Sequence, residues 1–149
     1  MIITEKELQI FSRQLILKDF SEKDFNFIQQ QHVILIGVGG LGCPIAQYLI
    51  STGIKNLTLI DNDNIQLSNL NRQILYNQCD LGKKKVDVAK EKLLLINKKN
   101  NINAIANMLS KENISKHLSS ASLVIDTTDN WQTMLLINEY CVKNSIPLL

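Results

Sequence analysis

The chain has 149 residues, which is enough for one domain with a sizeable core but too few for two full domains. Its content of 45% hydrophobic and 20% charged residues is ordinary for a globular protein, and no apolar stretch reaches the roughly 20 residues that span a bilayer. The formal net charge of +2 is too small to favour nucleic acid or a membrane surface as a partner.

The compartment expected from the sequence is the cytoplasm. The charged amino terminus lacks the apolar core of a secretory signal. The cysteines, Cys43, Cys79 and Cys141, are far apart and include no C-x-x-C pair. Neither a disulfide framework nor a complete zinc site can be built from them within one chain.

The hydrophobic pattern predicts helices and short apolar strands in alternation. Helices are expected at residues 5–18, 21–30, 43–52, 81–96, 111–118 and 131–144. Strands are expected at residues 32–37, 56–61, 101–108 and 122–130, the last running into a turn, and a fifth begins at residue 145. This order predicts a Rossmann-like, doubly wound α/β domain with a mostly parallel sheet at residues 31–149, after a helical segment at residues 1–30. Because no helix follows the last strand, we expect a sheet truncated before its second half, in a chain that is part of a longer protein.

Three glycines follow the first predicted strand in the spacing G-x-G-x-x-G. Gly37 suits the tight turn, Gly39 the close approach of a phosphate, and Gly42 the close packing of helix and strand. The helix that follows offers free N–H groups to an anion. Asp61 ends the second strand about 20 residues later, where an acid binds a ribose hydroxyl. On these features alone, an NAD-dependent oxidoreductase is the default expectation.

The other polar residues favour a nucleoside triphosphate over a nicotinamide. The two histidines, His32 and His117, lie at a strand start and in a polar helix end, without a credible catalytic partner. Polar residues instead follow the second and fourth strands, at the edge where open α/β sheets bind ligands. They are Asp61, Asp63, Ser68, Asn69, Arg72, Asp126, Thr127, Thr128, Asp129 and Asn130. With Lys85 at a helix start, this set offers cations for phosphates and a carboxylate for Mg²⁺.

Arginine is rare in this chain, and its positions are informative. Of the 16 lysine and arginine residues, only Arg13 and Arg72 are arginine. Guanidinium is planar, always charged and able to bridge two phosphate oxygens, whereas ammonium is a compact, strongly hydrated charge. A phosphate-binding role would explain why arginine persists at position 72 in a lysine-rich sequence.

Five sequence blocks carry a resemblance to a known family. They are "RQLIL" at 13–17, "GVGGLG" at 37–42, "DNDNIQLSNLNRQ" at 61–73, "GKKKV" at 82–86 and "DTTDN" at 126–130. In order and spacing they resemble the ThiF/MoeB family, the bacterial relatives of ubiquitin-activating enzymes. The resemblance implies an adenylyltransferase that uses Mg²⁺ and ATP on the C-terminal Gly-Gly carboxylate of a ubiquitin-like sulfur-carrier protein, in thiamine or molybdopterin sulfur transfer. It also implies a homodimer whose active sites are completed across the interface.

The resemblance assigns roles to the matching positions. The implied nucleotide-binding set is Gly37, Gly39, Gly40, Gly42, Asp61, Ser68, Asn69, Arg72, Lys85, Asp129 and Asn130. Within it, Gly40 and its neighbouring glycines would bind the phosphates, Asp61 the ribose, and Asp129 the Mg²⁺. The residues expected to act in catalysis are Arg13, Arg72, Lys85 and Asp129, with Arg13 reaching into the partner protomer's site.

Several positions have a second interpretation. Asp63 could be a turn residue or a ligand, and Ser68 could be a helix N-cap or a ligand. Asp126 is expected to bind backbone amides after its strand rather than a metal. Among the lysines at 83–85, a slip of one position would exchange Lys85 with a neighbour that is expected to be solvated.

Two features depart from the family pattern. The family commonly carries an arginine where this chain has Met134. The C-x-x-C pairs that bind Zn²⁺ in full-length members belong to a second half that these 149 residues do not contain. The alternative to an active enzyme is therefore a truncated or degenerate nucleotide-binding module. The blocks "FSRQ" and "RQILY" favour the thiamine-pathway branch slightly.

Overall fold

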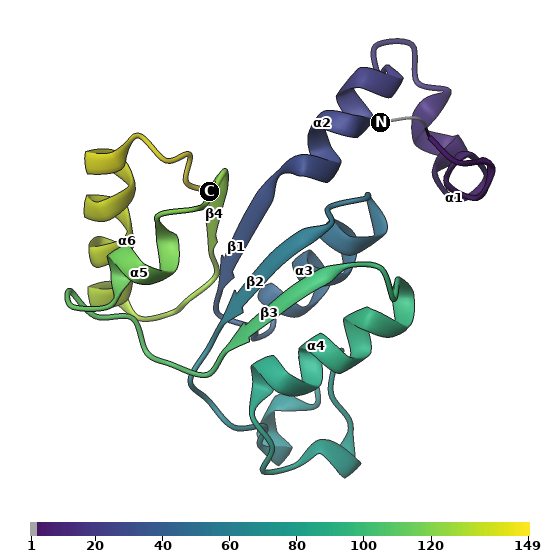
Figure 1. The fold of residues 1–149 in the computed structure, drawn as a ribbon. Coiled ribbons are helices and arrows are strands. Elements are labelled where there is room, and N and C mark those ends of the chain that lie inside the picture. Colours follow the sequence, from purple (N-terminus) through teal and green to yellow (C-terminus); the bar gives the residue numbers. More distant parts are fainter. Residues whose placement is uncertain (1–2) are drawn as a thin grey trace.

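A four-stranded parallel sheet forms the centre of the computed structural model, which describes residues 3–149 (Figure 1). Its strands are β1 His32–Ile36, β2 Asn56–Ile60, β3 Asn101–Ile105 and β4 Leu123–Asp126, in the order β3-β2-β1-β4. The chain runs outward from β1 to β3 and then returns to pair β4 with the other side of β1. The order therefore reverses between β1 and β4, and open α/β sheets bind ligands at such a reversal.

Helices cover both faces of the sheet, which confirms the doubly wound prediction. The helices α3 Gly42–Ser51 and α4 Lys85–Ile96 lie on one face, and α5 Ile114–Leu118 and α6 Trp131–Asn144 lie on the other (Figure 1). Successive side chains of β1 point to opposite faces, because strand side chains alternate. Val33 and Leu35 accordingly join the larger hydrophobic cluster, while Ile34 and Ile36 join the smaller one beneath α6.

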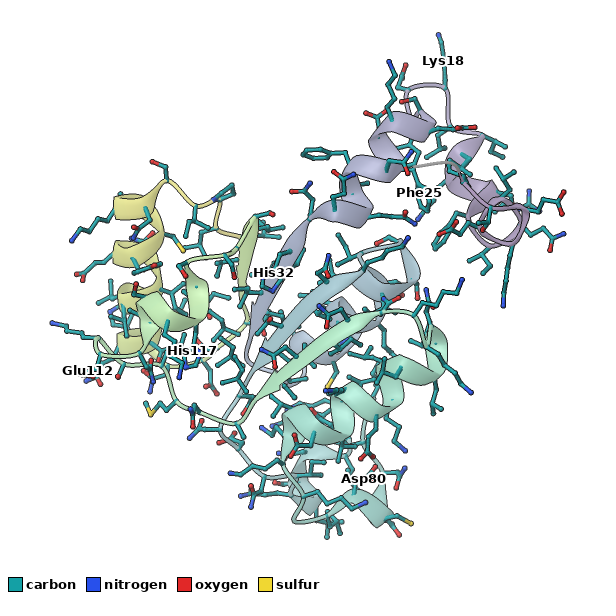
Figure 2. The ribbon with its side chains drawn as sticks, viewed as in Figure 1. Lys18, Phe25, His32, Asp80, Glu112 and His117 are labelled. Carbon is teal, nitrogen blue, oxygen red and sulfur yellow. The ribbon has the colours of Figure 1, made fainter. Side chains whose placement is uncertain are left out.

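The N-terminal segment is a pair of helices, α1 Glu5–Leu15 and α2 Glu22–Gln30. Each begins with a capping box, in which the N-cap hydroxyl and a carboxylate three residues later satisfy each other's backbone amides. Figure 2 shows Phe25 between the two helices, where its ring lies 4.7 Å from that of Phe11, centroid to centroid. These aromatic rings and Ile3 form a third, small cluster at the amino ends of the strands.

The structure changes some of the predicted boundaries. The helix predicted from residue 81 begins at Lys85, because a short 3-10 turn at Gln78–Asp80 and a bend precede it. In place of the predicted fifth strand, Leu148 forms a single parallel bridge with Val124 on the outer side of β4. Among residues 3–149, no helix is long and apolar enough to cross a membrane.

Candidate functional site

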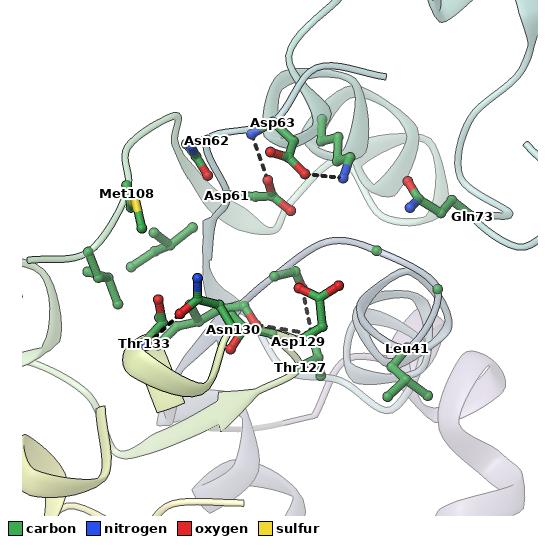
Figure 3. A pocket seen from close by; sticks show the side chains of 18 of the residues that line it. Leu41, Asp61, Asn62, Asp63, Gln73, Met108, Thr127, Asp129, Asn130 and Thr133 are labelled. Carbon is green, nitrogen blue, oxygen red and sulfur yellow. Dashed lines mark hydrogen bonds and ion pairs between the residues drawn. The ribbon is translucent and has the colours of Figure 1, made fainter. Parts of the chain in front are cut away.

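A cavity of about 820 Å³ opens at the carboxyl ends of the four strands (Figure 3). Its walls are the glycine loop after β1, the segments after β2 and β3, and the turn between β4 and α6. Of the nucleotide-binding set expected from the sequence, all members except Gly42 and Ser68 line this cavity. The tertiary structure therefore gathers, at the reversal of strand order, residues that are up to about 90 positions apart in the chain.

The glycine loop has positions where a side chain would collide with neighbouring backbone atoms. Gly37 has a φ of +86°, and a Cβ on it would lie 3.0 Å from the carbonyl oxygen of Thr127. A Cβ on Gly42 would lie 2.1 Å from the carbonyl oxygen of Gly37, so this position admits only hydrogen. Gly42 therefore serves the packing of α3 against the loop, while Gly39 and Gly40 face the cavity.

Asp61 connects the end of β2 to the glycine loop. Its Oδ2 accepts a hydrogen bond from the backbone N–H of Val38 at 2.7 Å, and its Oδ1 accepts one from the N–H of Asp63 at 2.8 Å. Each carboxylate oxygen has a further lone pair, so these contacts leave acceptor capacity for a ligand hydroxyl. The ribose contact expected of Asp61 remains a prediction.

Lys85 is the lysine that faces the cavity. Its side chain is only 7% exposed, and its ammonium lies 2.8 Å from Oδ2 of Asp63. The two preceding lysines point elsewhere: Lys83 contacts Asp80 and Lys84 donates to the carbonyl of Asn62. Asp63 is therefore more than a turn residue, because it lines the cavity and holds the cation.

Arg72 reaches the cavity from the segment after β2. One guanidinium nitrogen donates to the carbonyl oxygen of Ser68 at 2.9 Å and to Oδ1 of Asn71 at 3.0 Å. Its stem packs beside Gly40, where a Cβ would lie 3.4 Å from Cδ of Arg72. Arg72 lines the cavity, and a planar guanidinium can bind an anion through two oxygens.

Of the two expected nucleotide-binding residues Ser68 and Asn69, Asn69 lines the cavity and Ser68 does not. The N-cap of the 3-10 turn at Leu67–Asn69 is Gln66, so the N-cap interpretation of Ser68 is wrong. Ser68 lies outside the cavity wall and contributes its carbonyl to Arg72. The buried Asn69 lines the cavity while its Oδ1 accepts from the N–H of Gln66. These two residues shape the turn that carries Arg72.

The end of β4 and the turn after it contain one structural carboxylate and one exposed carboxylate. Oδ1 of Asp126 accepts from both the N–H and the hydroxyl of Thr128, as expected of a turn residue. Asn130 caps α6 by accepting from the N–H of Thr133 at 3.0 Å. Asp129 is exposed on the cavity wall (Figure 3). The Mg²⁺ contact expected of Asp129 remains a prediction.

The sequence reasoning missed two parts of the cavity wall. Gln73 is only 4% exposed, and its Oε1 is buried without a hydrogen-bond partner in the described part of the chain. Residues 107–109, which follow β3, form a further wall. The rule that ligands lie at the carboxyl ends of parallel strands would have indicated residues 107–109, whereas the orientation of Gln73 needed the tertiary structure.

Arg13 is the one expected catalytic residue that the fold does not bring to the cavity. It lies exposed on α1, and α1 sits beyond the amino ends of the strands (Figure 1). The cavity lies at the opposite ends of the same strands. The expectation that Arg13 acts in a partner protomer is compatible with this placement and stays a prediction. Met134, on α6, also lies outside the cavity wall.

Fold and site define the chain as a Rossmann-like α/β domain with a glycine loop facing two cations and an exposed carboxylate. Residues 11–149 match the ThiF family, and the chain belongs to that family. It is 34% identical over 147 residues to the molybdopterin-synthase adenylyltransferase of Escherichia coli. It is also 34% identical over 146 residues to the sulfur carrier protein adenylyltransferase of Thermus thermophilus.

These relatives are longer than this chain. The matches cover 99% and 98% of the chain but 59% and 54% of the two relatives. Among solved structures, E. coli tRNA N6-threonylcarbamoyladenosine dehydratase, TcdA, in complex with ATP, superimposes with a TM-score of 0.91 at 30% identity. That match covers 99% of this chain and 60% of the dehydratase, so the chain corresponds to little more than half of each protein.

Proposed function

We propose that the protein binds ATP in the cavity and adenylates the C-terminal carboxylate of a ubiquitin-like sulfur-carrier protein. The observation that carries this proposal is the convergence of the glycine loop, Arg72, Lys85 and Asp129 on one cavity at the strand-order reversal. Support also comes from the two relatives, which are named as adenylyltransferases, and from the structural neighbour, which is named as a complex with ATP.

The cavity fits the phosphates of ATP. Gly39 and Gly40 leave the loop backbone open to an anion, and Arg72 and Lys85 supply positive charge at the same cavity. Asp61, at the end of β2, is the proposed partner of a ribose hydroxyl. These groups suit a nucleoside triphosphate better than a nicotinamide, for which the described residues offer no hydride-transfer partner.

Asp129 fits the role of a Mg²⁺ ligand. No group of three or more His, Cys, Asp or Glu side chains suited to a metal occurs in residues 3–149. Mg²⁺ needs no such group, because it commonly takes one or two carboxylates and completes its shell with phosphates and water. When bound, the ion would neutralise phosphate charge.

The proposed reaction requires positioning and charge stabilisation. An ionised carboxylate oxygen of the carrier attacks the α-phosphorus, a new P–O bond forms, and the bond to pyrophosphate breaks with its electron pair on the leaving group. A terminal carboxylate is already ionised at neutral pH, so no general base is needed. Arg72 and Lys85 stabilise the charge that builds on the phosphate oxygens, and removing one such group costs about 10²–10³-fold in rate.

The proposed partners are a sulfur-carrier protein and a second copy of the chain, and the proposed compartment is the cytoplasm. The pathway is thiamine or molybdopterin sulfur transfer, with the thiamine branch preferred on the sequence blocks "FSRQ" and "RQILY". The competing proposal is a degenerate nucleotide-binding module, which Met134 at the family's arginine position favours.

An ATP–pyrophosphate exchange assay on the full-length protein separates these proposals. Exchange that depends on a Gly-Gly-tailed carrier and falls about 10²–10³-fold in Arg72→Ala would support adenylation. Parallel reactions with thiamine-type and molybdopterin-type carriers would decide the pathway. Nucleotide binding without exchange would favour the degenerate module, and exchange that requires tRNA instead of a carrier would overturn the carrier proposal.

A further inference from the structure

A buried residue of the glycine loop, Val38, is held at both of its backbone polar groups. Its N–H donates to Oδ2 of Asp61 at 2.7 Å, and its carbonyl oxygen accepts from the hydroxyl of Tyr76 at 2.9 Å. Val38 is 0% exposed, so water cannot replace either contact. The loop that faces the cavity is thus anchored from beneath by two segments that follow β2.

The Tyr76 hydroxyl also reaches the start of α4. It lies 3.3 Å from the carbonyl oxygen of Lys85, so the single hydroxyl proton can be shared between this oxygen and the carbonyl oxygen of Val38. The ammonium of Lys85 contacts Asp63, whose N–H donates to Asp61. The contacts therefore close into a ring that runs through Tyr76, Val38, Asp61, Asp63 and Lys85.

Tyr76 is the main donor to the Val38 carbonyl. Its side chain is 6% exposed, and burial raises the pKa of the phenol, which therefore keeps its proton across the physiological range. The Cys43 thiol lies 3.5 Å from the same oxygen, and burial raises its pKa as well. A thiol is a weak donor and would not replace the hydroxyl.

We propose that Tyr76 is a positioning residue of the candidate ATP site. Its hydroxyl clamps the glycine loop to the first residue of α4, which keeps the loop amides and the Lys85 ammonium at a fixed spacing for the phosphates. The role in ATP binding rests on the proposed function, whereas the clamp itself is a property of the free protein. Tyr76 acts through the loop and Lys85, because it does not line the cavity.

The variant Tyr76→Phe keeps the ring and removes the hydroxyl. Amide hydrogen exchange at residues 38–42 is expected to become about fivefold faster, since a buried hydrogen bond of roughly 1 kcal/mol is lost. The dissociation constant for ATP should rise several-fold, while the KM for the carrier stays unchanged. A general loss of stability would not produce this split between the two substrates.

Thr58→Val is a matched control, because it also removes a buried hydroxyl. Oγ1 of Thr58 lies 2.8 Å from Nε2 of His32, away from the cavity, and Thr58 is 3% exposed. This variant should lose comparable stability and leave both loop exchange and ATP affinity at wild-type values.

Equal loop exchange in Tyr76→Phe and wild type would overturn the clamp. Faster loop exchange with unchanged ATP affinity would overturn the positioning role. If the wild-type protein itself fails to bind ATP, the proposed function fails, and the exchange comparison still decides whether Tyr76 clamps the loop.

Discussion

The ammonium of Lys85 and the carboxylate of Asp63, 2.8 Å apart, form an ion pair between a side chain that is 7% exposed and one that is 60% exposed. The pair joins the segment after β2 to the first residue of α4. Because the cation is buried and the anion is not, the loss of the anion leaves an ammonium poorly solvated. The ion pair therefore stabilises the free protein, in addition to the role that we propose for Lys85 at the phosphates of ATP.

Asp63→Asn should lower the free energy of unfolding by about 1 kcal/mol, a value reduced by the solvent exposure of the carboxylate. Urea denaturation at neutral pH measures this change. Asp19→Asn, an exposed carboxylate between α1 and α2, is the control and should stay within about 0.5 kcal/mol of wild type. Equal stabilities of Asp63→Asn and wild type would show that the pair contributes nothing to folding.

The glycines of the loop should separate into a structural and a ligand-facing class. Gly42→Ala places a methyl 2.1 Å from the Gly37 carbonyl, and we expect a loss of stability of at least about 2 kcal/mol. Gly40→Ala meets only the Arg72 stem at 3.4 Å, an ordinary contact, so the fold should be kept while ATP affinity falls. Thermal unfolding and nucleotide titration of both variants test this division, and a stable Gly42→Ala protein would contradict the observed packing.

Arg13 should complement a site in the partner protomer. Arg13→Ala and Asp129→Asn homodimers are each expected to be nearly inactive in pyrophosphate exchange. After subunit exchange between equal amounts of the two, about a quarter of all sites should combine both wild-type residues and regain activity. If the mixture stays inactive although mass spectrometry detects mixed dimers, Arg13 does not act across the interface.

The capping box of α1 should make stability depend on acid pH. Oε2 of Glu7 accepts from the N–H and the hydroxyl of Thr4, and Lys55 and Gln29 contact Oε1. These contacts lower the pKa of Glu7 from 4.5 to about 2, and the hydrogen bond from the Thr4 backbone contributes most to this shift.

A carboxyl group whose pKa is lower in the folded than in the unfolded protein stabilises the fold fully when the pH is above its unfolded pKa. It loses that effect as the pH falls through its folded pKa. The difference in unfolding free energy between wild type and Glu7→Gln should therefore be largest above about pH 5, at roughly 1 kcal/mol. It should shrink between about pH 4.5 and pH 2. Urea denaturation across this range measures it, and a constant difference would rule out the Glu7 carboxylate as the cause.

Much of the fold could be predicted because its signals are local. The apolar runs of β1 and β2 and the glycine spacing each act within a few residues. The predicted start of α4 at residue 81 is wrong, because the backbone before Lys85 bends and the N–H of Gly82 donates to the carbonyl of Ile65. Boundaries of this kind depend on distant partners and not on the local pattern.

The sequence by itself determined the class of fold, the family blocks and most of the residues that line the cavity. Only the tertiary structure decided that Asp63 holds Lys85, that Ser68 serves Arg72 through its carbonyl, and that Tyr76 lies beneath the glycine loop. It also separated Arg13 from the cavity of its own chain. The physical reason is that periodicity and spacing reflect backbone geometry over a few residues, whereas a hydrogen-bond partner is chosen by which side chains the packed sheet brings within about 3 Å.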